Sequence, residues 1–220
     1  MDRRGRRQPS PSIGTLLLAM KMLRVGRENI PPVTLALVAL NSIVYFNPPI
    51  FGVDFGWASD NCLNGPAVFQ RLELKRIWLS TLFHLGDLHL YYNMSSLIWK
   101  GRFLEGSMGP KKFATLITVL ATLTGVVYLG MVWGLKSVFN MPSFYHQCAV
   151  GMSGVLFALK VILHNMDPQE AVPVWLLAFQ MRVSRTRLYS VNYLVWVLFL
   201  CVFFGFVLSM WPQSPIHLAQ

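Results

Sequence analysis

The sequence predicts an all-α polytopic membrane protein with about five transmembrane helices. Of its 220 residues, 54% are hydrophobic and 13% are charged, whereas soluble domains carry roughly 25% charged residues. The apolar residues form long continuous blocks, which the periodic pattern of an amphipathic core helix does not produce. A block of about 19 residues with few charges is long enough to cross the core of a bilayer. We therefore expect the lipid bilayer to be the environment of this chain.

The apolar blocks give the expected order of elements. Spans are predicted at residues 30–46, 88–99, 113–135, 148–163 and 191–211. Pro31 and Pro32 suit the start of the first helix, and the second block is short and unusually polar. A further apolar piece at 172–181 is too brief to span and indicates an interfacial or re-entrant segment.

Three regions follow from these blocks. Residues 1–29 form an N-terminal cytoplasmic segment whose pattern is compatible with an amphipathic helix at the membrane surface. Residues 30–165 hold the first four spans and form the core. Residues 166–220 are a divergent C-terminal region with one span at about 191–211.

The distribution of positive charge predicts the orientation. The first 29 residues hold seven Lys or Arg, and the segment 100–112 holds four. Segment 47–87 holds three against four acids, and segment 136–147 holds one. Because positive residues favour the cytoplasmic side, the N-terminus is predicted to be cytoplasmic. The net charge of +10 gives no indication of nucleic-acid binding, since the basic residues flank apolar segments and do not alternate with aromatics.

The three cysteines, Cys62, Cys148 and Cys201, are too few and too scattered to predict a disulfide framework or a zinc site. We expect Cys148 to be a small buried apolar residue, which is the common environment of a free cysteine.

Polar residues gather at one end of two predicted spans. Ser153 stands between Gly151 and Gly154 near the start of the fourth span, about a turn and a half inside the luminal face. His89 and Asn93 are four positions apart near the start of the second span, hence on one helix face. The small residues alone favour close helix packing. Together, the three polar groups favour a serine nucleophile with donors for an oxyanion.

The stretches "HLYYNM" (89–94) and "GMSGVLFAL" (151–159) resemble the rhomboid intramembrane serine proteases, which carry H-x-x-x-N on the second core helix and G-x-S-G at the head of the fourth. Residues 76–93 are also similar to the approach to that helix, and 29–41 with 148–161 resemble the endoplasmic-reticulum branch. The resemblance implies a rhomboid-like helical bundle. It also implies that Ser153 is the nucleophile and that Asn93, His89 and the Ser153 backbone stabilise the oxyanion. Transmembrane protein substrates would then be cleaved in the endoplasmic-reticulum membrane, without metal or cofactor.

The family pairs the serine with a histidine on a sixth core helix, in a G/A-H-x-x-G pattern, and that helix is not evident after residue 165. His164 lies eleven residues beyond the serine, about 16 Å along a helix, and is excluded as the base. His146 is expected in solvent, and His84 as a structural partner for backbone groups. His217, in "IHLAQ" at residues 216–220, stays open.

Other features leave the function open between classes. The family's Trp-Arg pair is replaced by "LKRIW" at residues 74–78. A catalytically impaired rhomboid-like protein that binds membrane clients in endoplasmic-reticulum quality control is the alternative to a protease. A small transporter or scaffold would leave the paired motifs unexplained.

Overall fold

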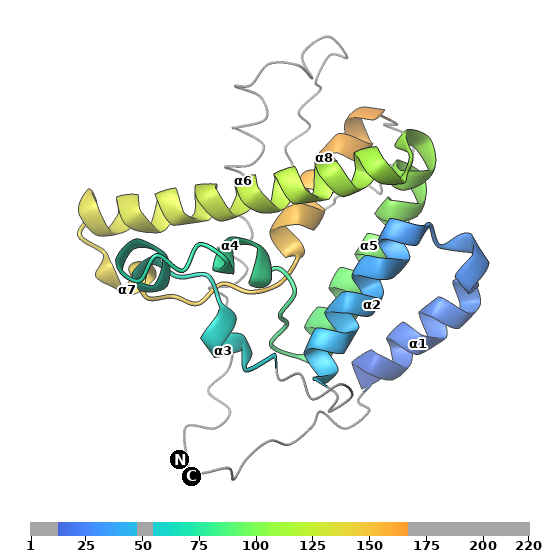
Figure 1. Ribbon diagram of the computed structural model, residues 1–220, viewed down its shortest axis with the longest axis horizontal. Helices are drawn as coiled ribbons and strands as arrows, with labels where there is room; N and C mark the ends of the chain where they lie inside the picture. The colour runs from blue at the N-terminus through green and yellow to red at the C-terminus, as the bar shows by residue number, and fades with distance from the viewer. Residues whose placement is uncertain (1–12, 48–54, 167–220) are drawn as a thin grey trace.

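The computed structural model describes residues 13–47 and 55–166. Every regular element in these ranges is helical: α1 Ile13–Val25, η1 Arg27–Asn29, α2 Pro32–Phe46, α3 Ala58–Asn61, η3 Pro66–Gln70, α4 Arg76–Leu79, α5 Asp87–Met108, α6 Pro110–Ser137, α7 Pro142–Tyr145 and α8 Ser153–Met166. Figure 1 shows α1, α2 and α5 side by side, with α6 running at a steep angle to them from the end of α5. The predicted segments 172–181 and 191–211 lie outside the described residues.

The four predicted spans that fall in the described part of the chain are helices. The second extends beyond residue 99 to Met108, and the fourth begins at Ser153 rather than at residue 148. Within these ranges α6, with 28 residues, is the helix long and apolar enough to cross a membrane, while α2 and the first part of α8 are shorter apolar helices. The all-helical prediction is thus confirmed for the described residues, and the count of five spans stays a prediction.

A buried carboxylate joins α2 to α5. Glu105 is 2% exposed and accepts hydrogen bonds from the backbone N–H groups of Val33 and Thr34 at 2.9 and 2.8 Å. The Thr34 hydroxyl donates to it as well, at 2.8 Å. The first N–H groups of a helix have no partner within the helix, and an anion there also meets the positive end of its dipole. Glu105 therefore fixes where α2 starts on α5.

The N-terminal helix α1 packs lengthwise on α5. The Gly14 N–H donates to the Asp87 carboxylate at 2.9 Å, and a Cβ at Gly14 would lie 2.6 Å from the Asp87 backbone. Helix α1 therefore begins at the same end of the bundle as α5 (Figure 1). This packing differs from that of a helix lying apart on the cytoplasmic surface, and the position of the N-terminus relative to the membrane stays a prediction.

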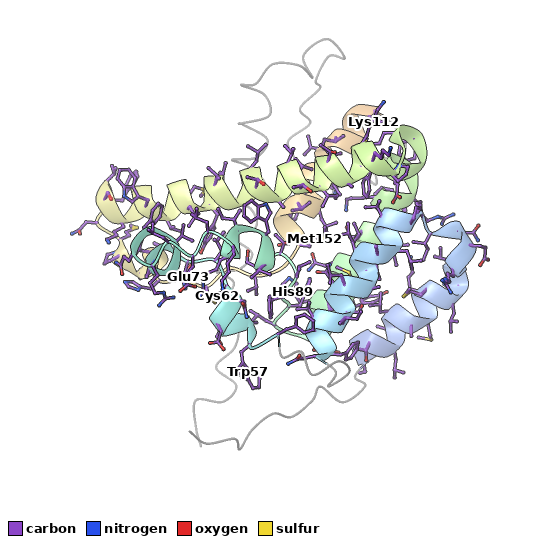
Figure 2. All side chains as sticks on the ribbon, viewed as in Figure 1. Trp57, Cys62, Glu73, His89, Lys112 and Met152 are labelled. Carbon is purple, nitrogen blue, oxygen red and sulfur yellow. A yellow bond between two sulfur atoms is a disulfide. The ribbon has the colours of Figure 1, made fainter. Side chains whose placement is uncertain are left out.

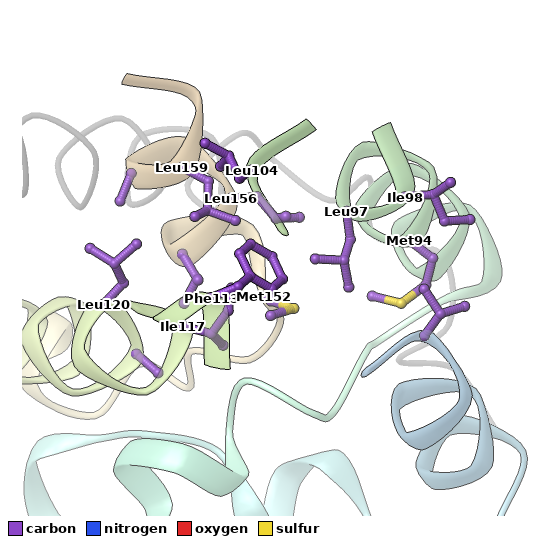
Figure 3. Packing of buried hydrophobic residues seen from close by; sticks show 14 of the residues in the cluster. Met94, Leu97, Ile98, Leu104, Phe113, Ile117, Leu120, Met152, Leu156 and Leu159 are labelled. Carbon is purple, nitrogen blue, oxygen red and sulfur yellow. The ribbon is translucent and has the colours of Figure 1, made fainter. Parts of the chain in front are cut away.

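The main core lies between α5, α6 and α8. Figure 3 shows Leu97 of α5, Leu120 of α6 and Leu156 of α8 in this packing. Phe113 and Leu159 are fully buried there. Within a bilayer such contacts stabilise the bundle through van der Waals packing rather than through removal of water. The core thus holds the start of α8 against the middle of α5 and α6.

The segment from residue 55 to 86 is fastened to the bundle by "LKRIW" at residues 74–78. Arg76 is 7% exposed; it pairs with Glu73 and donates to the Cys62 carbonyl at 3.0 Å. Ile77 packs so closely on Gly125 of α6 that an added Cβ would lie 2.8 Å from its side chain. The Trp78 indole donates to the Thr122 hydroxyl at 3.0 Å. Residues 76–78 therefore anchor the segment to the chain around Cys62 and to α6.

Candidate active site

Ser153 is the first residue of α8, and the chain before it is not helical. Gly151 has φ +106°, a backbone conformation that residues other than glycine rarely adopt. This conformation is not helical, so the helix cannot extend back through Gly151. The Gly151 N–H donates to the Ser80 carbonyl at 2.9 Å. The expectation that the fourth helix starts at residue 148 was therefore wrong, and the depth of Ser153 in the membrane stays a prediction. Ser153 instead stands at the helix N-terminus, where backbone N–H groups are free to donate.

The segment before the serine is covalently bound to the preceding loop. Cys62 and Cys148 form a disulfide with Cα atoms 5.3 Å apart. Beside it, Leu63 and Ala149 exchange two backbone hydrogen bonds of 2.9 and 3.0 Å. The expectation of a free, buried Cys148 was wrong: its sulfur is bonded and the residue is exposed. The charge count predicted that both cysteines lie on one side of the membrane. That shared side was the signal in the sequence that could have indicated a disulfide between them.

His89 and Asn93 face this segment from α5. His89 is in the first turn of the helix, and Asn93 follows one turn later and is 5% exposed. The Asn93 Nδ2 donates to the His89 carbonyl at 2.9 Å, which fixes the direction of the amide. A Cβ built on Gly151 would lie 2.7 Å from His89 Cε1 and 3.9 Å from Asn93 Nδ2. Figure 2 shows His89 and Met152 near this junction of α5 and α8.

The three predicted residues line one cavity of about 890 Å³. Ser153, His89 and Asn93 form part of its wall, together with residues of α6 such as Thr124 and Tyr128. Ser153 is partly exposed. Within the described residues, its hydroxyl forms no hydrogen bond. The hydroxyl is thus open to a molecule in the cavity.

This arrangement has the parts that acyl transfer requires. A serine oxygen needs nearby donors for the negative charge that develops on the attacked carbonyl. An asparagine amide has two N–H groups, and one of those on Asn93 is free of the His89 carbonyl. The N-terminus of α8 adds backbone N–H groups. No group of three or more His, Cys, Asp or Glu that could hold a metal ion occurs in the described ranges.

The rhomboid domain matches residues 71–219, which include all three of these side chains. This chain belongs to the rhomboid family.

Its relatives are rhomboids of several kinds. The chain is 42% identical over 165 residues to "Rhomboid-related protein 4" of Homo sapiens, covering 74% of this chain and 50% of that protein. It is 40% identical over 136 residues to "Rhomboid-like protein 14, mitochondrial" of Arabidopsis thaliana, covering 61% and 41%. It is 31% identical over 107 residues to "Rhomboid-type serine protease 2" of Eremothecium gossypii, covering 49% and 39%. The chain spans about half the length of the first of these, or less of the others, and no solved structure matches it significantly.

The histidines of this rhomboid differ in environment. His84 is buried in the segment before α5, and its ring meets that of His89 edge-on with centroids 4.9 Å apart. Burial, and secondarily the charge of His89, lower the pKa of His84 to about 3. The ring lies near the Leu82 carbonyl, yet neither nitrogen forms a hydrogen bond of ordinary geometry with the described residues. The expected role of His84 as a partner for backbone groups therefore stays a prediction.

The remaining candidates for a base are accounted for as follows. His146 is exposed, as predicted, and its ring packs on Tyr145. His164 lies on α8, eleven residues beyond Ser153. His217 lies outside the described residues. Within the described part of the chain, no histidine is hydrogen-bonded to the serine.

Proposed function

We propose that this rhomboid is an intramembrane serine endopeptidase that cleaves transmembrane or juxtamembrane peptide bonds of membrane proteins. The observation that carries the proposal is the shared cavity: Ser153 at the N-terminus of α8 opens into the same space as Asn93 and His89 of α5. Three polar groups on two helices are costly in a membrane unless they face a cavity and serve a function.

In the proposed reaction the Ser153 oxygen attacks the carbonyl carbon of the scissile bond. The oxyanion is stabilised by the free N–H of Asn93, by His89 and by the Ser153 N–H. The amine leaves with a proton, and water then hydrolyses the acyl-enzyme and regenerates the hydroxyl. A base has to accept the serine proton, and His217, which lies outside the described residues, is the candidate that the labelling experiment tests. A serine that lacks its base loses most of its activation.

The proposed location is the endoplasmic-reticulum membrane, with the candidate site facing the lumen. The Cys62–Cys148 disulfide supports the luminal placement of the candidate site, because disulfides persist in oxidising compartments such as that lumen. The charge count puts Cys62 in a luminal segment and Cys148 at the luminal start of the predicted fourth span.

Labelling with a fluorophosphonate tests the nucleophile. The full-length chain in microsomes should be labelled, and the Ser153→Ala variant should not. His217→Ala should lose the labelling as well if that histidine is the base. Cleavage of a membrane substrate that survives Ser153→Ala would contradict the assignment.

A client-binding rhomboid without catalysis is the second candidate. The observation in its favour is that Ser153 has no base among the described residues. A folded protein that resists labelling but retains membrane clients would support this candidate.

A further inference from the structure

Two lysines line the same cavity, deeper in the bundle than the proposed catalytic groups. Lys100 of α5 and Lys160 of α8 both belong to its wall. Lys100 follows Asn93 by seven positions, and Lys160 follows Ser153 by seven. Seven residues are close to two helical turns, so each lysine shares a helix face with its polar neighbour, about 10 Å further along.

Lys100 is a buried cation without an acidic partner in the described ranges. Its side chain is 6% exposed. Its ammonium donates to the Ser96 hydroxyl and lies 5.8 Å from the centre of the Trp99 ring. Neither contact offsets the free-energy cost of burying the ammonium, because a buried charge is costly unless an opposite charge pairs with it.

The nearby carboxylates do not reach the lysines. Glu105 is committed to the start of α2. Asp87 also lines the cavity, but it stands thirteen positions before Lys100, about 19 Å along α5. The two lysines contribute positive charge to one cavity wall from two different helices. An anion in this cavity would therefore meet a cation from each of the two helices.

We propose that Lys100 and Lys160 bind an acidic side chain of the transmembrane substrate. This inference rests on the proposed function, since it places the scissile bond at Ser153. An extended chain covers 10 Å in about three residues and a helix in about seven. The geometry therefore assigns an Asp or Glu three to seven residues from the scissile bond, on the side that runs into the membrane. A substrate carboxylate is favoured over a lipid phosphate, because a chain that reaches Ser153 through this cavity passes the lysines.

Binding is tested with the full-length Ser153→Ala protein in phosphatidylcholine nanodiscs. The probes are single-span peptides in which one Asp, or Asn as its neutral counterpart, is moved along the membrane half of the span. We expect Asp at one register to bind about tenfold more tightly than Asn. Lys100→Met and Lys160→Met should remove this preference. Lys112→Met, which removes the same charge from an exposed position outside the cavity wall, should retain it.

Cleavage of the same peptides by the wild-type protein gives the register, because mass spectrometry locates the cut bond. The preferred Asp should lie within the predicted window. Unfolding midpoints show whether each variant is folded, and the half-buried Lys160 provides the test if Lys100→Met does not fold. Equal binding of Asp and Asn peptides at every register would overturn the proposal. It would also be overturned if anionic lipid bound in a Lys100-dependent manner while Asp gave no preference.

The two proposals can fail separately. If the Asp preference is present but no peptide is cut, the lysine site stands and the protease function falls. If peptides are cut in a Ser153-dependent manner without any preference for Asp, the protease function stands and the lysine site falls.

Discussion

Gly151 lies directly against His89, with no room for a side chain between them. A Cβ at Gly151 would stand 2.7 Å from His89 Cε1 and 2.8 Å from Nε2, and the glycine has φ +106°. Gly154, on the other side of the serine, differs, because a Cβ there would meet Thr124 at an ordinary 3.6 Å. The two glycines that flank the serine motif therefore serve different purposes.

This difference gives the first prediction. Gly151→Ala should destabilise the fold by roughly 1–3 kcal/mol, because it combines backbone strain with a clash, and it should abolish labelling of Ser153. Gly154→Ala should retain both stability and labelling. Thermal unfolding in detergent and fluorophosphonate labelling measure the two effects. A fully labelled Gly151→Ala protein would contradict the geometry of this junction.

Asn93 provides a second prediction on catalysis. Asn93→Ala should lower kcat about 10²- to 10³-fold with little change in KM, because an oxyanion donor acts in the transition state. Asn41→Ala is the matched control, since Asn41 is also buried and donates to a backbone carbonyl four residues earlier, that of Leu37, at 2.7 Å. Asn41 lies on α2, outside the cavity wall. Equal losses of activity in the two variants would indicate a structural role for Asn93.

The buried His84 predicts how stability depends on pH. Because the pKa of His84 is lowered to about 3 in the fold and is about 6.5 when unfolded, the unfolded state binds the extra proton between these values. Stability contributed by the neutral ring is thus present above about pH 6.5 and is lost as the pH falls, by at most about 1.4 kcal/mol per unit. In His84→Phe, the unfolding midpoint should depend less on pH between about pH 7.5 and 5 than it does in the wild-type protein. The exposed His146→Gln should leave the slope unchanged, and an unchanged slope in His84→Phe would contradict the prediction.

The disulfide gives a prediction on stability and accessibility. The bridge closes a loop of 86 residues in sequence, so Cys62→Ser should cost roughly 2–4 kcal/mol of unfolding free energy. It should also make Cys148 reactive with a maleimide polymer under non-reducing conditions, seen as a gel shift. Labelling of Ser153 should fall, since the bridge holds the segment before the serine. Cys201→Ser leaves both bridge sulfurs in place and serves as the control; a wild-type protein that reacts at Cys62 without a reductant would refute the bridge.

Much of the fold was accessible from local properties of the chain. Long apolar blocks and few charges predicted the helices that became α2, α5, α6 and α8, because hydropathy and block length depend only on neighbours in sequence. The four-residue spacing of His89 and Asn93 put both on one face of α5. Counting positive charges predicted that the serine lies at the same end of the bundle as His89 and Asn93. The joint position of Ser153, Asn93 and His89 on one cavity was predicted from these properties and the family resemblance.

Contacts between distant segments decided the rest. The start of α8 at Ser153 depends on Gly151 meeting Ser80 and His89, and the Cys62–Cys148 bridge joins segments far apart in sequence. The burial of His84 depends on the packing around it. Likewise, seven-residue spacings exist on each helix, but only the packing of α5 on α8 turns Lys100 and Lys160 toward one cavity. Sequence by itself determined which segments are helical and which faces are polar, whereas the tertiary structure decided which of those faces meet, because pairing of faces depends on packing between helices and not on the order of residues within one.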